Sequence, residues 1–231
     1  MKKYILSLMA LVVLALTSCT DRDSEGLTRF TTYAVITMQG DDYMVIDKGA
    51  AFADPGVKAD LGGEDVSADI VIKSDVDTNK SGVYSVSYSY TNADGFSSAA
   101  NRTVVVLDPN DPVEGFWYTD PSSYRLYNGN QTAFGNYFEV LIINEGHGTY
   151  SIDDVLAGWY GQRAGYGAKY YMGAVLTLDG DNNLDCIYSY IPGWSDGLTD
   201  FADGKFDPEA GTITYMAQYV SGMQFFVTLT K

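Results

Sequence analysis

The sequence contains one histidine and two cysteines in 231 residues. A nucleophilic triad needs a base beside its nucleophile, and the single candidate, His147, lies in "EGHGT", where the flanking glycines indicate an exposed turn. A zinc site is equally hard to assemble from one histidine and so few cysteines. The scarcity of these side chains argues against triad hydrolases and zinc enzymes.

Positive charge is also scarce, because 14 lysines and arginines face 30 aspartates and glutamates, giving a formal net charge of −16. Such a surface repels phosphate backbones and anionic headgroups. We therefore expect no nucleic-acid partner, and we expect any membrane association to come from a lipid and not from a basic patch. A hydrophobic content of 46% with 14% aromatic residues indicates a folded, β-rich protein.

The one long apolar run extends from Tyr4 to Leu16 and follows Lys2 and Lys3. A membrane-spanning helix needs about 20 apolar residues, so the pattern predicts a signal peptide over residues 1–18. The run ends in "LTSC", which resembles the bacterial lipobox, and this resemblance implies lipidation of Cys19. The alternative is an ordinary secretory signal with a cysteine near the cleavage site.

The segment after Cys19, "TDRDSEG", is short and acidic, so residues 19–32 are expected to form a flexible tether. It resembles the acidic tag of surface-exposed Bacteroidetes lipoproteins, which implies an outer-membrane lipoprotein that faces the cell exterior. The alternative is a plain spacer on a periplasm-facing lipoprotein. Lipidation of Cys19 also leaves Cys186 without a disulfide partner, and its apolar setting, "LDCIYSYI", predicts a small buried side chain.

The rest of the chain divides at "LDPNDPVEG", whose prolines and acidic residues predict a stiff linker over residues 109–114. Apolar alternation and β-branched residues predict strands at 33–38, 68–74, 83–90, 102–107, 115–119, 137–144, 174–179, 186–191, 212–219 and 223–231. A single helical turn is predicted at 152–158. The sequence therefore predicts an all-β protein with a small sandwich over residues 33–108 and an antiparallel β-barrel or sandwich over residues 115–231.

Several separated motifs occur in order within the first domain. They are Asp54, Pro55 and Gly56 in "FADPGVKA", then Gly82, Tyr84 and Tyr88 in "SGVYSVSYSY", and then Arg102. These motifs resemble the bacterial immunoglobulin-like (Ig-like) domain first described in a pesticidal crystal protein. Because such domains are usually spacers or adhesion modules, the resemblance implies an Ig-like β-sandwich and no catalysis.

The second domain contains "GTYSIDDVLAGWYGQRAGYG", "IPGWSDG" and the terminal "GTITYMAQYVSGMQFFVTLTK". These segments resemble the C-terminal domain of Bacteroidetes lipoproteins of unknown function, whose genes tend to lie among starch-utilisation-like glycan-uptake loci. The resemblance implies a glycan ligand and a partner in an outer-membrane transport complex. It implies no defined activity.

The stretch "GWYGQRAGYGAKYY" at 158–171 places aromatic rings, glycines and two cations together. Pyranose rings pack their C–H faces on aromatic rings, and their hydroxyls need polar partners. The predicted ligand-binding residues are Trp159, Tyr160, Arg163, Tyr166, Trp194 and Asp196, with Trp159 and Trp194 as the leading pair. The competing interpretation is that such tyrosines and tryptophans are core residues with polar tips in water.

The segment "DGDNNLD" offers a candidate calcium site, since oxygen-bearing side chains alternate at Asp179, Asp181, Asn183 and Asp185. The loop has Leu184 where an EF-hand needs glycine and Tyr190 where it needs glutamate. A hairpin turn is therefore the better interpretation, and we expect no metal and no cofactor.

The resulting hypothesis is a lipid-anchored outer-membrane protein that binds glycans through its C-terminal domain as an accessory to polysaccharide uptake and is not an enzyme. One alternative is a non-catalytic structural or protein-partner subunit of an outer-membrane complex, because exposed aromatic residues also serve protein interfaces. A second alternative is a glycan hydrolase, since a chain with 30 acidic residues could supply the two carboxylates that glycoside hydrolysis needs.

Overall fold

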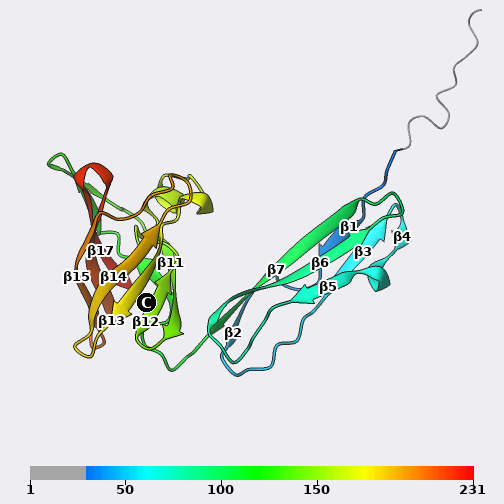
Figure 1. Ribbon diagram of the computed structural model, residues 1–231, viewed down its shortest axis with the longest axis horizontal. Coiled ribbons are helices and arrows are strands. Elements are labelled where there is room, and N and C mark those ends of the chain that lie inside the picture. The colour runs from blue at the N-terminus through cyan, green and yellow to red at the C-terminus, as the bar shows by residue number, and fades with distance from the viewer. Residues whose placement is uncertain (1–29) are drawn as a thin grey trace, which may run out of the picture.

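The computed structural model describes residues 30–231, which are almost entirely β-structure. Two β-domains lie end to end along the long axis of the molecule (Figure 1). Cys19, the predicted signal peptide and most of the predicted tether lie outside the described residues. Within residues 30–231, no helix has the length and apolar character that crossing a bilayer requires.

The first domain is a two-sheet sandwich. Its strands are β1 (Val35–Met38), β2 (Tyr43–Asp47), β3 (Val57–Leu61), β4 (Glu64–Asp65), β5 (Val71–Ser74), β6 (Gly82–Thr91) and β7 (Ser97–Leu107). One sheet has the order β1-β3-β4 and the other β2-β7-β6-β5. Val86, Tyr88 and Val104 fill the space between the sheets, so the predicted alternation of β6 does bury one face of that strand. The all-β, Ig-like prediction for this domain is confirmed.

A buried arginine joins the motif residues of the sandwich. Arg102 is 0% exposed, and its Nη2 donates to the carbonyl oxygens of Gln39 at 2.8 Å and Gly56 at 3.1 Å. Its Nε lies 3.5 Å from Oδ1 of Asp54, which also accepts a 2.6 Å hydrogen bond from the Tyr88 hydroxyl. Burial and this carboxylate raise the pKa of Tyr88 to about 12. Four of the motif residues, Asp54, Gly56, Tyr88 and Arg102, therefore form one polar network around the buried guanidinium group.

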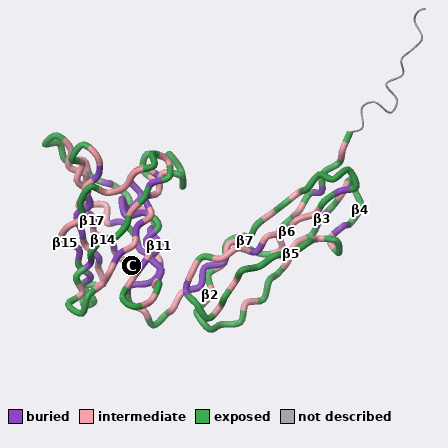
Figure 2. The backbone as a smooth tube through the Cα atoms, in the orientation of Figure 1, coloured by how far each residue is buried: buried purple, intermediate pink, exposed green. Residues whose placement is uncertain are grey.

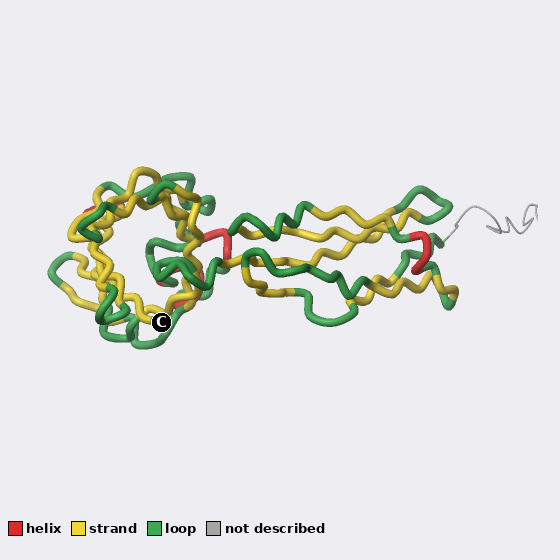
Figure 3. The backbone as a smooth tube through the Cα atoms, turned by 90° about the horizontal axis from the view of Figure 1, so that it is seen from below, coloured by secondary structure: helices red, strands yellow, loops and turns green. Residues whose placement is uncertain are grey.

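The second domain is a closed barrel. Its strands are β8 (Gly115–Thr119), β9 (Tyr124–Tyr127), β10 (Asn130–Ala133), β11 (Glu139–Gly146), β12 (Thr149–Ile152), β13 (Gly173–Leu178), β14 (Asn183–Tyr190), β15 (Asp200–Asp207), β16 (Thr212–Tyr219) and β17 (Met223–Thr230). Strands β8 and β11 to β17 follow one another antiparallel, and β17 pairs back onto β8 to close the ring seen end-on in Figure 3. Of the two predicted architectures, the structure is therefore the eight-stranded barrel.

One end of the barrel is filled by residues 154–159, which we call the plug. Val155, Leu156, Ala157 and Trp159 are all buried in the barrel core. The wall holds the plug backbone through hydrogen bonds: Tyr215 donates to the carbonyl oxygen of Val155 at 3.0 Å, and Thr119 donates to that of Ala157 at 2.8 Å. The barrel interior is therefore a packed core, as the buried segments in Figure 2 also show.

Contacts across the linker join the two domains. Glu114 is only 3% exposed and accepts a 3.0 Å hydrogen bond from the Ser81 hydroxyl of the sandwich. The terminal Lys231 donates to the carbonyl oxygen of Glu114 at 2.9 Å. Val105 of β7 packs in one apolar cluster with Leu141 of β11. These contacts restrict rotation at the junction.

The strand predictions at 115–119 and 212–219 coincide with β8 and β16. The sequence analysis does not predict β9, β10, β12 or β15 in the barrel. β15 reads "DFADGKFD" and contains Asp203 at a φ of 55°, where its pairing with β16 is irregular. Composition alone does not identify this strand, because a bulged strand with acidic residues and glycine has low β-propensity.

The Arg102 network yields a stability prediction. Replacing Arg102 with alanine removes the cation beside the Asp54 carboxylate and the side-chain donor to two carbonyl oxygens, so we expect a loss of about 3–5 kcal/mol in the free energy of unfolding. Urea unfolding of the purified protein measures it. The control is Lys48→Ala, which removes an exposed ion pair with Asp108 and should cost less than about 1 kcal/mol. Equal losses in the two variants would contradict the role given to Arg102.

Candidate functional site

Aromatic side chains from three separate segments meet at one end of the barrel. This aromatic cluster consists of Tyr160, Tyr166, Tyr170, Trp194 and Tyr219. The Trp194 ring contacts those of Tyr160 and Tyr170 edge-on, with centroids 4.7 and 4.9 Å apart. It also lies nearly parallel to the Tyr219 ring at 6.1 Å. The rings come from the segment after the plug, the 191–196 turn and the end of β16.

The opening of the 158–171 segment is helical, with the wide turn of a π-helix from Trp159 to Arg163. The amide of Arg163 donates to the Gly158 carbonyl and that of Ala164 to the Trp159 carbonyl, each five residues back. A short 3₁₀ turn, Ala168–Tyr170, follows. The predicted helical turn therefore leads directly into a π-helix, a rare geometry that is frequent at functional sites.

Asp154 anchors the start of this segment. It is 0% exposed, and its carboxylate accepts hydrogen bonds from the backbone amides of Leu156, Gly158 and Met172 at 3.0–3.1 Å. Burial raises the pKa of Asp154 to about 7, although these donors lower it. One buried carboxylate thus ties the plug to the segment that returns to β13.

Two positions require glycine because a tyrosine ring packs directly against the backbone there. A Cβ on Gly161 would lie 2.0 Å from the Tyr171 ring, and a Cβ on Gly193 would lie 2.4 Å from the Tyr170 ring. These glycines admit side chains of the protein itself. Gly193 therefore makes room for a ring of the aromatic cluster, and Gly161 for the neighbouring Tyr171.

The cluster combines exposed faces with a buried polar pair. Tyr166 is 55% exposed and Trp194 40%, whereas Tyr219 is only 2% exposed. The Tyr219 hydroxyl donates a 2.6 Å hydrogen bond to Oδ1 of Asp196. Burial and the adjacent carboxylate hold the pKa of Tyr219 well above its usual value. Asp196, two residues after the exposed Trp194, thus brings a carboxylate group to the cluster.

Trp159 requires a correction. It is 3% exposed and packs edge-on against Phe134 at 4.8 Å and Phe225 at 5.6 Å inside the barrel. Its ring is therefore unavailable as a sugar platform, and the pairing of Trp159 with Trp194 expected from sequence does not occur. The guanidinium carbons of Arg163 and Arg125 lie 4.2 and 4.8 Å from its ring centroid.

The structure brings Tyr160, Tyr166, Trp194 and Asp196 together. Arg163 instead lies over the buried Trp159 ring and donates from Nε to the Phe134 carbonyl oxygen. Sequence reasoning missed Tyr219 and Arg125. Tyr219 reads as an ordinary end of a strand, and Arg125 lies on the unpredicted β9. No local pattern links either of them to the 158–171 segment.

The calcium candidates form the β13–β14 turn. The Asp179 carboxylate accepts hydrogen bonds from the backbone amides of Asp181 and Asn183 and from the Asn183 side chain. Oδ1 of Asn183 accepts from the Lys205 ammonium at 3.1 Å. The Asp179 oxygens and that Asn183 oxygen are thus engaged within the turn, and no group of three acidic, histidine or cysteine side chains suited to a metal occurs in residues 30–231.

Residues 193–197 read "GWSDG", which has the GxSxG spacing that the sequence analysis overlooked. Ser195 is exposed and has a φ of 60°. His147 lies in the two-residue turn between β11 and β12, next to the Leu178 end of β13, whereas Ser195 follows the opposite end. His147 is therefore too distant to act as a base for Ser195. Cys186 is free and only partly buried, since its side chain lies where β14 leaves β15.

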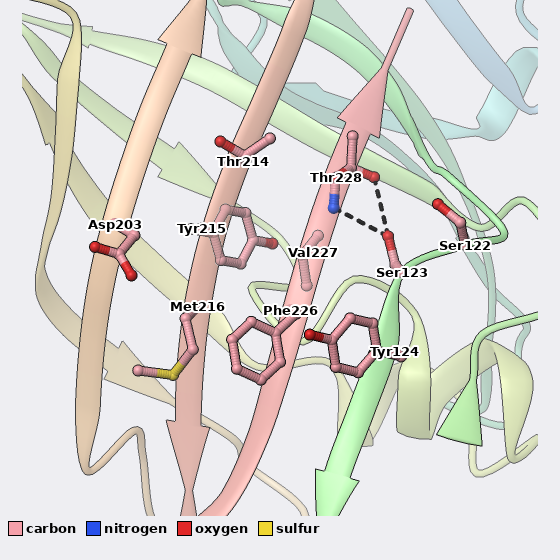
Figure 4. A pocket seen from close by; sticks show the side chains of 10 residues that line it. All are labelled: Ser122, Ser123, Tyr124, Asp203, Thr214, Tyr215, Met216, Phe226, Val227 and Thr228. Atoms are coloured by element: carbon pink, nitrogen blue, oxygen red, sulfur yellow. Dashed lines mark hydrogen bonds between the residues drawn. The ribbon is translucent and has the colours of Figure 1, made fainter. Parts of the chain in front are cut away.

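Shallow concavities also lie on the barrel wall. A groove of about 300 Å³ crosses β15 to β17 and is bordered by Asp203, Met216, Phe226 and Tyr124 (Figure 4). A second, of about 420 Å³, lies where β15 separates from β14. Among described residues these strands pair only at Asn183↔Lys205 and Leu184↔Gly204. Neither groove includes a predicted ligand-binding residue.

Comparisons with known proteins match both domains. A family model for a C-terminal domain matches residues 107–231, and the model for the Ig-like domain of bacterial surface proteins matches residues 36–106. The crystal structure of the lipoprotein BT2262 from Bacteroides thetaiotaomicron is 33% identical, with a TM-score of 0.70, over 86% of this chain and 100% of that chain. The chain belongs to the family of this lipoprotein. The resemblance to Bacteroidetes lipoproteins with these two domains is thereby confirmed.

Other solved structures are much less similar to this chain in sequence and in fold. CBM51-2 with INT domains of Clostridium perfringens ZmpB, solved in complex with GlcNAc, is 18% identical over 51% of this chain and 31% of that chain, with a TM-score of 0.27. No curated protein matches the chain. What the family establishes is a lipoprotein-type fold of two domains, with a surface-type Ig-like domain at its start.

The burial of Asp154 leads to a prediction about pH. Because burial raises its folded-state pKa to about 7, the stabilisation is complete below about pH 4 and is lost as pH rises through about 7. We expect the free energy of unfolding to fall by about 2–3 kcal/mol between about pH 5 and about pH 8. Urea unfolding at both pH values measures this.

The Asp154→Asn variant should lose most of this pH dependence, because it lacks the titrating carboxyl group. It should also lower stability by about 1–3 kcal/mol at acid pH, because its amide group opposes a buried backbone donor. The matched control is Asp181→Asn at an exposed turn, which should retain the wild-type pH profile. A wild-type profile in the Asp154 variant would show that another group titrates.

Proposed function

We propose that this protein is a lipid-anchored outer-membrane protein that binds glycans at the aromatic cluster and has no catalytic activity. The observation that carries the proposal is the convergence of Trp194, Tyr166 and Tyr170 with the carboxylate of Asp196 at one end of a rigid barrel. Aromatic faces beside a carboxylate acceptor match the two requirements of a pyranose, which are a flat apolar surface and partners for its hydroxyl groups. Membership in a Bacteroides lipoprotein family supports the cell-surface part of the proposal.

The packed interior of the barrel favours binding at its rim. Plug residues occupy the space that a lipocalin-type barrel leaves for a ligand. A chain-like ligand that lies across the rim needs no enclosed cavity. The interlocked rings are also held in place by Gly193 and by the hydrogen bond from Tyr219 to Asp196, so the site needs little ordering when a ligand binds.

The arrangement of the two domains supports the proposal that the sandwich acts as a spacer. The cluster lies at the Tyr219↔Met223 end of the β16–β17 pair, whereas Lys231, at the other end of β17, contacts the linker. The eight residues of β17 span about 26 Å. The cluster is therefore held away from the junction by the length of the barrel.

Glycan-array screening followed by titration calorimetry tests the site. We expect Trp194→Ala and Tyr166→Ala each to weaken binding by about tenfold or more, because each removes a platform of ring carbon atoms. The control is Tyr188→Ala, whose ring is 59% exposed, similar to the 55% of Tyr166, but lies on the barrel wall. It should leave affinity unchanged.

Each alternative function has its own outcome in this experiment. Failure of the wild-type protein to bind any glycan overturns the proposal and favours a protein-partner subunit. Binding that survives both cluster variants places the glycan elsewhere, as in the groove of Figure 4. Release of new reducing ends from a bound polysaccharide would favour the hydrolase.

Surface display is tested on intact cells. Protease added outside should degrade the protein, because the proposed orientation exposes both domains to the medium. A periplasmic protein serves as the control for membrane integrity and should stay intact. Full protection of this protein would place it on the periplasmic side.

A further inference from the structure

Two arginines share one tryptophan ring beside the aromatic cluster. Arg125 comes from β9 and Arg163 from the end of the π-helix. Their guanidinium carbons lie 4.8 and 4.2 Å from the Trp159 ring centroid, so they are at most about 9 Å apart. Cation–π contacts hold each group in position but do not neutralise its charge.

Neither arginine has an acidic partner in the part of the chain that the structure describes. The ion pairs there are Lys48 with Asp108 and Arg102 with Asp54. This is unexpected in a chain whose acidic residues outnumber its basic ones by 30 to 14. Two neighbouring cations without a counter-ion repel each other, and an anion between them would relieve that repulsion.

Hydrogen-bonding capacity is also unused at this pair. Nε of Arg125 is buried and has no acceptor within residues 30–231. Arg163 donates from Nε to the Phe134 carbonyl oxygen at 3.1 Å, which leaves its two amino groups for another acceptor. Guanidinium groups with free donors are suited to the paired oxygens of a carboxylate or sulfate.

The pair adjoins the cluster through Tyr160. Arg125 of β9 pairs with Phe225 of β17, and the Phe225 ring centroid lies 6.1 Å from that of Tyr160. The Tyr160 ring in turn contacts the Trp194 ring at 4.7 Å. A sugar resting on Trp194 therefore places its ring substituents within reach of this side of the barrel end.

We propose that Arg125 and Arg163 bind an oxyanion carried by the glycan, either the carboxylate of a uronic acid or a sulfate ester. This inference rests on the proposed glycan binding and narrows it to acidic polysaccharides. The aromatic cluster supplies the sugar platform, and the arginine pair selects the charge.

The test compares acidic polysaccharides with their neutralised forms. The probes are polygalacturonate with its methyl-esterified form, and chondroitin sulfate with its desulfated and carboxyl-reduced forms, together with neutral amylopectin and galactomannan. We expect an acidic probe to bind at least about tenfold tighter than its neutralised form and to weaken with added salt. The carboxyl-reduced and desulfated forms show which oxyanion is recognised.

Arg125→Gln and Arg163→Gln should lower affinity for the acidic probe to that of its neutralised form. Arg163→Lys should give an intermediate loss of affinity, because lysine keeps the positive charge but lacks the paired donors of the planar guanidinium group. Lys73→Gln, which removes an exposed cation from the sandwich, is the matched control and should bind like the wild type. If Arg125→Gln fails to fold, the exposed Arg163 variants decide the result.

The outcomes separate the two proposals. If neutral and acidic forms bind equally and the arginine variants bind normally, glycan binding stands and the oxyanion site is overturned. If no probe binds in any form, both proposals fail. Selective binding of acidic forms that survives loss of both arginines also overturns the assignment.

Discussion

The pairing of β17 with β8, at Leu229↔Thr119 and Thr230↔Tyr118, is the contact on which the rest of the molecule depends. An open sheet of this length would present two unpaired edges to other chains. Closure also brings the C-terminal Lys231 to the linker, where it contacts the Glu114 carbonyl. The same two residue pairs therefore complete the barrel and help to fix its junction with the sandwich.

Closure creates an interior, and the plug determines what that interior can do. An eight-stranded barrel has room for side chains or for one small ligand, and here Val155, Leu156 and Trp159 take that room. This arrangement buries the Asp154 carboxyl group completely, and none of the ion pairs in residues 30–231 includes it. Burial of that group without a cation is unfavourable when it is ionised. Rings that cannot enter the filled core, among them Tyr166 and Trp194, remain at the rim, where a ligand can reach them.

The sequence was sufficient for the all-β class and the division into two domains, because strand alternation and turn residues are local signals. β16 and β6 are recognisable from their own residues, and the family-like motifs identify the sandwich. Strands whose residues lack β-propensity, such as β15, are stabilised by pairing with neighbouring strands. That pairing cannot be deduced from the residues of the strand itself. Arg125 was missed for the same reason, because it lies on the unpredicted β9. Tyr219 lies on a predicted strand, and its contact with Tyr160 and Trp194 is a tertiary one.

Trp159 shows where local reading fails for a functional site. Its neighbours Gly158 and Tyr160 suggested an exposed loop, yet a left-handed turn at Ala157 and Gly158 directs the chain so that the tryptophan enters the core. The direction of a side chain at such a turn depends on backbone dihedrals that several residue types can adopt at modest cost.

The burial of Trp159 gives it a different role, because a ring fixed in the core is a firm support for two guanidinium groups at the surface. Most of the chain repels anions, since its net charge is −16. A local pair of arginines in that background would attract an anion only at short range, after the sugar ring has already found Trp194. Polyanions without a suitable sugar face would then be rejected by the surrounding acidic surface, so the negative charge of the protein would itself contribute to selectivity.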